Sequence, residues 1–320
     1  MAILATLALA AAIQSSAQTS PVQTDINALG PAGPLRGTLL APASTDVPVI
    51  LIVPGSGATD RNGDSPGLRT STYKQLAEGL SAGGIATVRI DKRGMYGSVL
   101  AIADANAVTI GDYATDVHSW VAAIRKRTGV ACVWVLGHSE GGLVALVAGE
   151  SPSDICGLIL MATPGRPLGE VIRKQLQSSG ADARVLSNAL ATLDVLDAGQ
   201  QVDETRIDPA WMPLFRPQVQ GLLMSELALD PATLIAAFEK PVLIMQGQRD
   251  TQVRLRDAKQ LKRADPQAEL VLLPDTNHFF KSASAGGGSE NVPSTNSDFP
   301  LENHVIDDIY NFVKSAPTNR

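Results

Sequence analysis

The chain has 320 residues, of which 44% are hydrophobic and 18% are charged, and its formal net charge is −6. This composition excludes an intrinsically disordered chain and fits one large domain or two small ones. The negative net charge, without any Lys/Arg-rich stretch, argues against a nucleic-acid partner, because such proteins need a basic surface.

The first seventeen residues, MAILATLALAAAIQSSA, form an uncharged apolar run that ends in small residues. The run is too short for a stable membrane span, and its ending is typical of a signal-peptidase site. We therefore expect residues 1–17 to be a signal peptide and the mature protein to begin near Gln18, exported to the periplasm or the medium. Because no Lys or Arg precedes the run, the alternative is a disordered or loosely packed tail on a cytoplasmic protein.

From Gln18 onward, strand-like and helix-like segments alternate. Strands are expected at 23–26, 35–41, 49–53, 85–90, 132–136, 158–161, 242–245 and 270–273, and helices at 72–82, 109–127, 140–149, 254–264 and 301–314. The first two strands flank the Gly30–Gly33 turn and predict a hairpin. The remaining alternation predicts an α/β fold, with a mostly parallel sheet that helices cover on both faces.

Two segments interrupt this alternation. Residues 165–238 contain amphipathic helices but no convincing strand, which predicts a helical insertion resting on the sheet of a single domain spanning 18–320. Residues 282–300 are rich in Gly, Ser and Asn and predict a mobile surface loop.

The chain has two cysteines, Cys132 and Cys156, each near the start of an apolar strand-like run. Two cysteines make neither a disulfide framework nor, without nearby histidines, a zinc site. We expect two buried free thiols. The alternative is one disulfide, provided that the two strands are neighbours and the chain is exported.

Residues Gly137–Gly142 read Gly-His-Ser-Glu-Gly-Gly and lie between an apolar strand and an apolar helix. A serine on a tight strand-to-helix turn sits in strained backbone geometry, so its near neighbours must be small. The turn raises the hydroxyl above the sheet, at the positive end of the helix. This context favours Ser139 as a nucleophile over a plain glycine-rich turn.

A serine nucleophile needs a histidine base oriented by a carboxylate, and in this architecture the chain order is serine, acid, histidine. His278 follows the 270–273 strand and is the best candidate for the base, whereas His118, His138 and His304 fit less well. Asp250 follows the 242–245 strand and is preferred as the acid over Asp275, which is expected to support its own turn.

The developing oxyanion requires two backbone N–H donors. The Glu140 amide, directly after the nucleophile, is one candidate. The second is the Ser56 amide in the loop after the 49–53 strand, with Gly57 as a reserve.

Two further motifs are not expected to carry chemistry. Residues 60–64 resemble the start of a calcium loop, but the glycine is misplaced and Ser71 stands where the bidentate glutamate belongs. Residues 91–94, Asp-Lys-Arg-Gly, are expected to close a loop through salt bridges.

Over residues 20–316 the sequence resembles the α/β-hydrolase family, most closely bacterial esterases near the dienelactone-hydrolase and acyl-peptidase branches. The likeness is carried by Pro54-Gly55-Ser56-Gly57, Arg89–Gly94, Gly137–Gly142, Gly247–Asp250 and Asn277–Phe280. It implies the α/β-hydrolase fold, a catalytic triad of Ser139, Asp250 and His278, and a helical cap over the site. Pro54 departs from the family, since many members have His there.

These features predict a serine hydrolase that cleaves small-molecule carboxylic esters and needs no metal or organic cofactor. Trp211 and Phe215 of the helical insertion are expected to line an acyl or leaving-group pocket, the alternative being a purely structural layer. Peptidase, thioesterase and lactonase activities are alternatives within the fold, and a non-catalytic binding protein is an alternative outside it.

Overall fold

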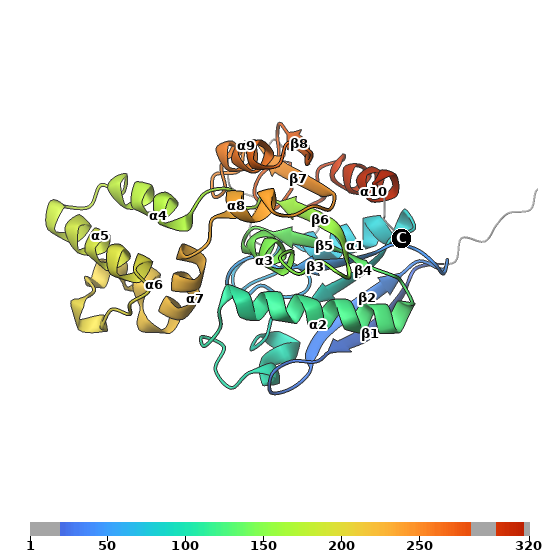
Figure 1. Cartoon of the computed structure of the whole chain (residues 1–320), viewed down its shortest axis with the longest axis horizontal. Coiled ribbons are helices and arrows are strands. Elements are labelled where there is room, and N and C mark those ends of the chain that lie inside the picture. Colours follow the sequence, from blue (N-terminus) through green and yellow to red (C-terminus); the bar gives the residue numbers. More distant parts are fainter. Residues whose placement is uncertain (1–19, 283–298, 317–320) are drawn as a thin grey trace, which may run out of the picture.

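Eight strands form one sheet in a computed structural model that describes residues 20–282 and 299–316 (Figure 1). Their order is β1-β2-β4-β3-β5-β6-β7-β8. The strands are β1 Val22–Ala28, β2 Leu35–Ala41, β3 Val49–Val53, β4 Ala86–Ile90, β5 Val133–His138, β6 Ile155–Met161, β7 Val242–Gly247 and β8 Glu269–Leu273. The expected hairpin is confirmed as the antiparallel pair β1–β2. Strand β2 also pairs antiparallel with β4, and all later pairings are parallel.

Ten α-helices in the described ranges accompany this sheet. They are α1 Thr72–Ala82, α2 Ile110–Thr128, α3 Glu140–Ala148, α4 Leu168–Gln177, α5 Ala183–Asp197, α6 Met212–Phe215, α7 Pro217–Leu227, α8 Pro231–Ala236, α9 Leu255–Ala264 and α10 Val305–Ser315, with short 3-10 helices at Tyr96–Ala101, Glu204–Arg206 and Pro209–Trp211. None of them has the length and apolar character needed to cross a bilayer. The expected signal peptide and most of the expected 282–300 loop lie outside the described residues.

Each face of the sheet has its own apolar core, as the expected α/β class requires. Helices α1 and α10 pack on one face, where Leu76, Leu80 and Ile309 are fully buried. Helices α2, α3, α8 and α9 pack on the other face. Because the central strands are buried on both sides, β3 reads as the continuous apolar run Val-Ile-Leu-Ile-Val rather than as an alternating pattern.

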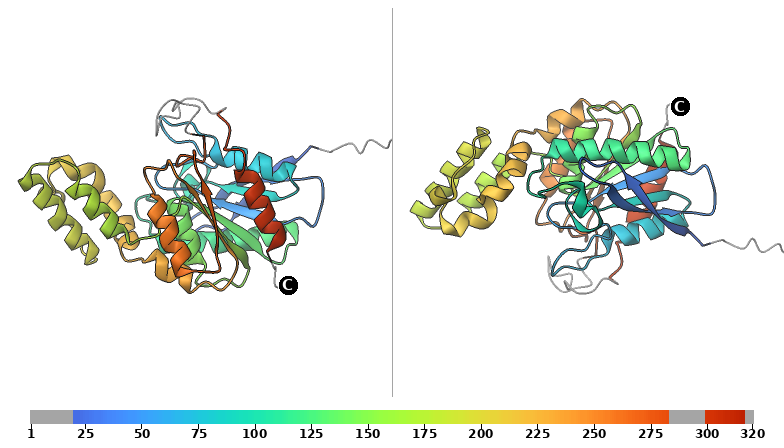
Figure 2. Two further views of the ribbon diagram at one scale, coloured as in Figure 1. Left: turned by 90° about the horizontal axis from the view of Figure 1, so that it is seen from above. Right: turned by 90° about the horizontal axis from the view of Figure 1, so that it is seen from below.

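The helical insertion departs from the expectation that it rests on the sheet. In both figures α4, α5 and α6 stand to one side of the sheet, and α7 and α8 lead back to it (Figures 1 and 2). The apolar faces of α4, α5 and α7 pack against one another around Leu193, Leu196 and Phe215, in a cluster separate from the two sheet cores. The insertion therefore buries its own apolar residues, so it does not need the sheet face for this purpose.

The two cysteines form a disulfide, with 5.2 Å between the Cα atoms of Cys132 and Cys156. The expectation of free thiols was wrong. Cys132 directly precedes β5 and Cys156 lies in β6, and these strands are neighbours in the sheet with a register shift at Val133/Trp134. This pairing brings together two residues that are separated by 24 positions in sequence.

Candidate active site

Ser139 occupies the turn between β5 and α3 in a backbone conformation that few residues adopt, with φ 55° and ψ −121°. The neighbouring glycines make this turn possible. A Cβ atom on Gly137 would lie 2.2 Å from the carbonyl oxygen of Gly141, and one on Gly142 would lie 1.9 Å from Oγ1 of Thr163. The glycine pattern of the motif therefore reflects close approach of backbone to backbone and of helix to strand.

His278 and Asp250 meet at the carboxyl edge of the sheet, although 28 residues separate them. Nδ1 of His278 lies 2.7 Å from Oδ2 of Asp250. The other carboxylate oxygen accepts hydrogen bonds from the amides of Gln252 and Val253, at 2.8 and 2.9 Å. Both side chains are buried. The carboxylate is thus fixed in place and holds the imidazole in one orientation.

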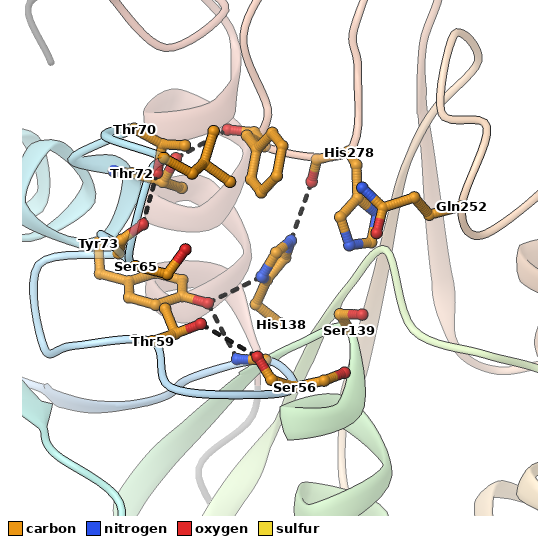
Figure 3. A pocket seen from close by; sticks show the side chains of 14 residues that line it. Ser56, Thr59, Ser65, Thr70, Thr72, Tyr73, His138, Ser139, Gln252 and His278 are labelled. Atoms are coloured by element: carbon orange, nitrogen blue, oxygen red, sulfur yellow. Dashed lines mark hydrogen bonds between the residues drawn. The ribbon is translucent and has the colours of Figure 1, made fainter. Parts of the chain in front are cut away.

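Ser139 and His278 line the same pocket, together with Ser56 of the loop after β3 (Figure 3). Asp250 contacts the imidazole of His278 at Nδ1. The sequence prediction thus named residues that the fold brings to one place. Within the described part of the chain, neither the Ser56 amide nor the Glu140 amide donates to another group, as expected for a loop and for the first turn of a helix.

The loop that carries Ser56 is held at Gly55 from both sides. The Gly55 amide donates to the phenol oxygen of Tyr73 at 3.0 Å, and its carbonyl accepts from Nζ of Lys92 at 2.7 Å. Lys92 also forms a buried salt bridge with Glu140 at 2.9 Å. Lys92 thereby connects the two segments whose amides are the oxyanion candidates.

The salt-bridge role expected for residues 91–94 is confirmed. Asp91 pairs with Arg61, and Arg93 pairs with Asp116 and Asp112. In addition, Lys92 reaches the active site, which the motif alone did not indicate.

His138, which sequence reasoning treated as a variable motif position, is a buried part of the site. Its Nε2 lies 2.9 Å from the main-chain carbonyl oxygen of His278, and its Nδ1 lies 2.8 Å from the Tyr73 oxygen (Figure 3). Burial lowers the pKa of His138 to about 3, so the ring is neutral. Because a carbonyl only accepts, Nε2 carries the proton and donates, and Nδ1 accepts from the Tyr73 hydroxyl.

Tyr73 was also missed, because the sequence placed it on the expected 72–82 helix with no sign of a polar partner. Burial raises the pKa of its phenol, which keeps the hydroxyl protonated as a donor. The resulting chain runs from the Gly55 amide through Tyr73 and His138 to the carbonyl of His278. It joins the Ser56 loop to the histidine loop directly beneath the pocket.

A carboxylate of the insertion approaches the same region. Glu226 on α7 is hydrogen-bonded to Glu140, and burial together with the charge of Glu140 raises the pKa of Glu226 to about 8. Lys92 opposes this rise. Glu226, Glu140 and Lys92 therefore form an ionisable cluster between the insertion and the turn that carries Ser139.

Trp211 and Phe215 do not line the pocket at Ser139, which corrects the sequence expectation. Phe215 is fully buried in the insertion's own core, and Trp211 packs against that core while its indole N–H donates to the carbonyl of Val185. Their apolar surface is thus used inside the insertion. The helical cap over the site that the family resemblance implied is not formed by these residues.

The pocket at Ser139 has a volume of about 230 Å³ and a wall of mixed polar and apolar character. Its side chains include Thr59, Ser65, Thr70 and Gln252, with Leu68 and Phe279 as the main apolar contributors. No Asp or Glu is among the described residues that line it. The described residues also contain no group of three or more His, Cys, Asp or Glu side chains that could hold a metal ion.

The sequence matches the family model described as serine aminopeptidase, S33, over residues 67–280, which is more than half of the chain. The chain belongs to this S33 family. The α/β-hydrolase resemblance is thereby confirmed, and Ser139 lies within the matched S33 region together with Asp250 and His278.

Among curated relatives of this S33 protein, Esterase EstD of Thermotoga maritima is 30% identical over 285 residues, which cover 86% of this chain and 64% of EstD. The AB hydrolase superfamily protein YisY of Bacillus subtilis is 30% identical over 160 residues, 44% of this chain and 58% of YisY. The chain thus spans less than two thirds of the length of these relatives.

Solved structures show the same fold at low sequence identity. The Pyrococcus furiosus esterase Pf2001 matches with a TM-score of 0.56 and 16% identity, over 92% of this chain and 93% of that one. Est1E from Butyrivibrio proteoclasticus matches with a TM-score of 0.53 and 19% identity, over 80% of this chain and 90% of that one.

Proposed function

We propose that this protein is a serine hydrolase that cleaves carboxylic esters through an acyl-enzyme intermediate. Ser139 is the nucleophile, His278 the general base and acid, and Asp250 the residue that orients the imidazole. One observation carries the proposal: the imidazole of His278, bonded to buried Asp250 at 2.7 Å, lines the same pocket as Ser139.

In the first half-reaction, Nε2 of His278 accepts the Ser139 proton as Oγ attacks the carbonyl carbon. The amides of Ser56 and Glu140 donate hydrogen bonds to the oxyanion of the tetrahedral intermediate. When the intermediate collapses, the C–O bond to the alcohol breaks and His278 gives its proton to the leaving oxygen. Water then attacks the acyl group, His278 takes its proton, and Ser139 recovers its own.

His138 and Tyr73 act in this mechanism as positioning residues. They hold the main chain of His278 and the amide of Gly55 in fixed relation, and so set the distance between the base and the oxyanion loop. The neutral state of His138 avoids a second positive charge 4.8 Å, ring centre to ring centre, from the His278 imidazolium.

Ester cleavage is favoured over aminopeptidase activity by the chemistry of the pocket. A substrate with a free α-ammonium group would need a carboxylate beside the nucleophile, and no Asp or Glu is among the described residues lining this pocket. The 30% identical relative is named an esterase. A volume of about 230 Å³ suits a short acyl group, with Leu68 and Phe279 as apolar contacts.

Export of the protein is part of the proposal. The apolar run of residues 1–17 has the small-residue ending of a signal peptide, and a Cys132–Cys156 disulfide persists in an oxidising compartment but is rare in a reducing one. N-terminal sequencing of exported protein tests this, and a retained Met1 contradicts it.

The catalytic proposal is tested by Ser139→Ala with p-nitrophenyl acetate as substrate. The variant should lose turnover while its far-UV circular dichroism spectrum stays that of the wild type. Full activity in this variant would remove Ser139 from the mechanism. Screening oxygen esters beside thioesters and aminoacyl amides of the same acyl length separates esterase from thioesterase and peptidase.

A further inference from the structure

A second hollow, of about 520 Å³, lies between α4 of the insertion and the segment 248–256 that follows β7. Both of its walls carry cations. Arg166 and Lys174 come from the insertion side, and Arg254 and Arg256 come from the start of α9. We call this hollow the basic groove, after these four cationic residues.

The basic groove is connected to the pocket at Ser139. A hollow of about 200 Å³ lies between them, and it shares Leu68, His278 and Phe279 with the Ser139 pocket. Gln252 lines all three hollows. The three hollows are therefore adjacent, and His278 lines both the Ser139 pocket and the hollow between that pocket and the groove.

The charge of this groove is not neutralised within the described part of the chain. Arg166 is paired with Asp257, at 2.9 and 3.1 Å. The side chains of Lys174, Arg254 and Arg256 form no ion pair with another described residue, although the chain carries a net charge of −6.

Carboxylates near the groove are already engaged. Asp250 is the one acidic residue among those lining it, and its oxygens are bonded to His278 and to two main-chain amides. Arg249 lines the connecting hollow and is paired with Asp275 at 3.6 Å, with both side chains 59% exposed. Asp275 offsets the charge of Arg249, so the net positive charge of the groove comes from Lys174, Arg254 and Arg256.

The position of the groove on the His278 side of the site indicates which half of the substrate it binds. His278 must protonate the leaving oxygen, so the leaving group lies on the side of the imidazole. The connecting hollow is lined by His278 and shares Thr251 and Gln252 with the groove. The acyl group then occupies the Ser139 pocket, whose wall has no Asp, Glu, Lys or Arg among its described residues.

We infer that the natural substrate is an ester whose leaving alcohol carries an anionic group, a carboxylate or a phosphate, which the basic groove binds. This inference rests on the proposed esterase function. Guanidinium groups bind both kinds of oxyanion with charge-assisted hydrogen bonds, and several like charges around a concave site attract anions from solution.

The test compares aryl acetates that share one acyl group. 4-Acetoxybenzamide provides a neutral leaving group, 4-acetoxybenzoate and 3-(4-acetoxyphenyl)propionate provide carboxylates at two lengths, and 4-acetoxyphenyl phosphate provides a phosphate. For each enzyme the measured quantity is the ratio of kcat/KM for the anionic ester to kcat/KM for the neutral one. Comparing this ratio between enzymes cancels the intrinsic reactivity of the esters.

We expect the ratio to fall about tenfold in the Lys174→Gln/Arg254→Gln/Arg256→Gln variant, and to fall in the wild type as salt rises from 20 to 500 mM. Arg127→Gln, at the exposed end of α2, is the matched control and should keep the wild-type ratio. The single Arg254→Gln variant, with a smaller fall, replaces the triple variant if that does not fold.

Equal ratios in wild type and in the groove variants for all anionic esters would overturn the inference. A fall confined to the carboxylates or to the phosphate supports it and identifies the anion. Failure of wild-type enzyme to cleave even the neutral ester would count against the esterase proposal instead, so the two failures are distinguishable.

Discussion

The Tyr73 oxygen lies 2.8 Å from Nδ1 of His138 and 3.0 Å from the amide nitrogen of Gly55. This one phenol thus connects the oxyanion loop to the residue that supports the His278 main chain. Its position links two segments that reach the site from opposite sides of the nucleophile.

Replacing Tyr73 with Phe removes the oxygen and leaves two buried polar groups, the Gly55 amide and Nδ1 of His138, without a partner. We expect kcat to fall about tenfold, since a misplaced hydrogen bond of this kind costs about 1.4 kcal/mol. KM should change less, because the phenol acts on the geometry of the catalytic groups. Tyr310→Phe on α10 is the control, and an unchanged kcat for Tyr73→Phe would exclude the positioning role.

The Cys132–Cys156 bridge lies at the amino ends of β5 and β6, away from the edge that carries Ser139. Cys132→Ser/Cys156→Ser should therefore lower the free energy of unfolding by about 3 kcal/mol, the amount expected for closing a loop of this length. The activity of the folded variant should remain. Urea unfolding measures the first and ester turnover the second. Two titratable thiols in the native, unreduced protein would contradict the bridge.

Substitutions at Phe215 and Leu68 distinguish a structural role in the insertion from a role in the Ser139 pocket. Phe215→Ala creates a cavity in the insertion's own core and should lower stability by about 3 kcal/mol without changing the preference for acyl-chain length. Leu68→Ala widens the Ser139 pocket and should raise the relative rate with butyrate over acetate esters. An altered chain-length preference in the Phe215→Ala variant would show that Phe215 contributes to the substrate pocket.

Glu226 should make stability depend on pH. Its folded-state pKa is raised from 4.5 to about 8, so the folded protein holds a proton that the unfolded chain releases at lower pH. The contribution of Glu226 to stability is therefore fully present below about pH 5 and is lost between about pH 5 and 8, by at most about 1.4 kcal/mol per pH unit. The titratable groups that interact with Glu226 are Glu140, Lys92 and Tyr113.

Glu226→Gln keeps the hydrogen bond to Glu140 but cannot ionise, so its thermal midpoint should decline less over this range than that of the wild type. Glu170→Gln, at an exposed position on α4, serves as the control. Parallel declines in wild type and Glu226→Gln would show that Glu226 does not hold the proton.

The order of strands and helices was predictable because β3 and β5 are apolar runs that each lead into a glycine-containing turn, while α2 repeats its apolar residues at helical spacing. The grouping of Ser139, Asp250 and His278 was predictable for a related reason. Each follows a parallel strand, and parallel strands deliver their carboxyl ends to one edge.

Other features depended on contacts that no local pattern records. The Cys132–Cys156 bridge depends on β5 and β6 being neighbours, and the role of His138 depends on a tyrosine 65 residues away. The amphipathic helices of the insertion were recognisable from the sequence. Their apolar faces, however, could pack either on the sheet or on one another. The assignment of Trp211 and Phe215 to the pocket failed for this reason.

The most direct test of the central claim is to react the native protein with a fluorophosphonate and to locate the adduct by peptide mass spectrometry. The account predicts one adduct, on Ser139, formed much more slowly when His278 is replaced by Ala. Stoichiometric labelling at a different residue, or no labelling of folded protein at neutral pH, would contradict it.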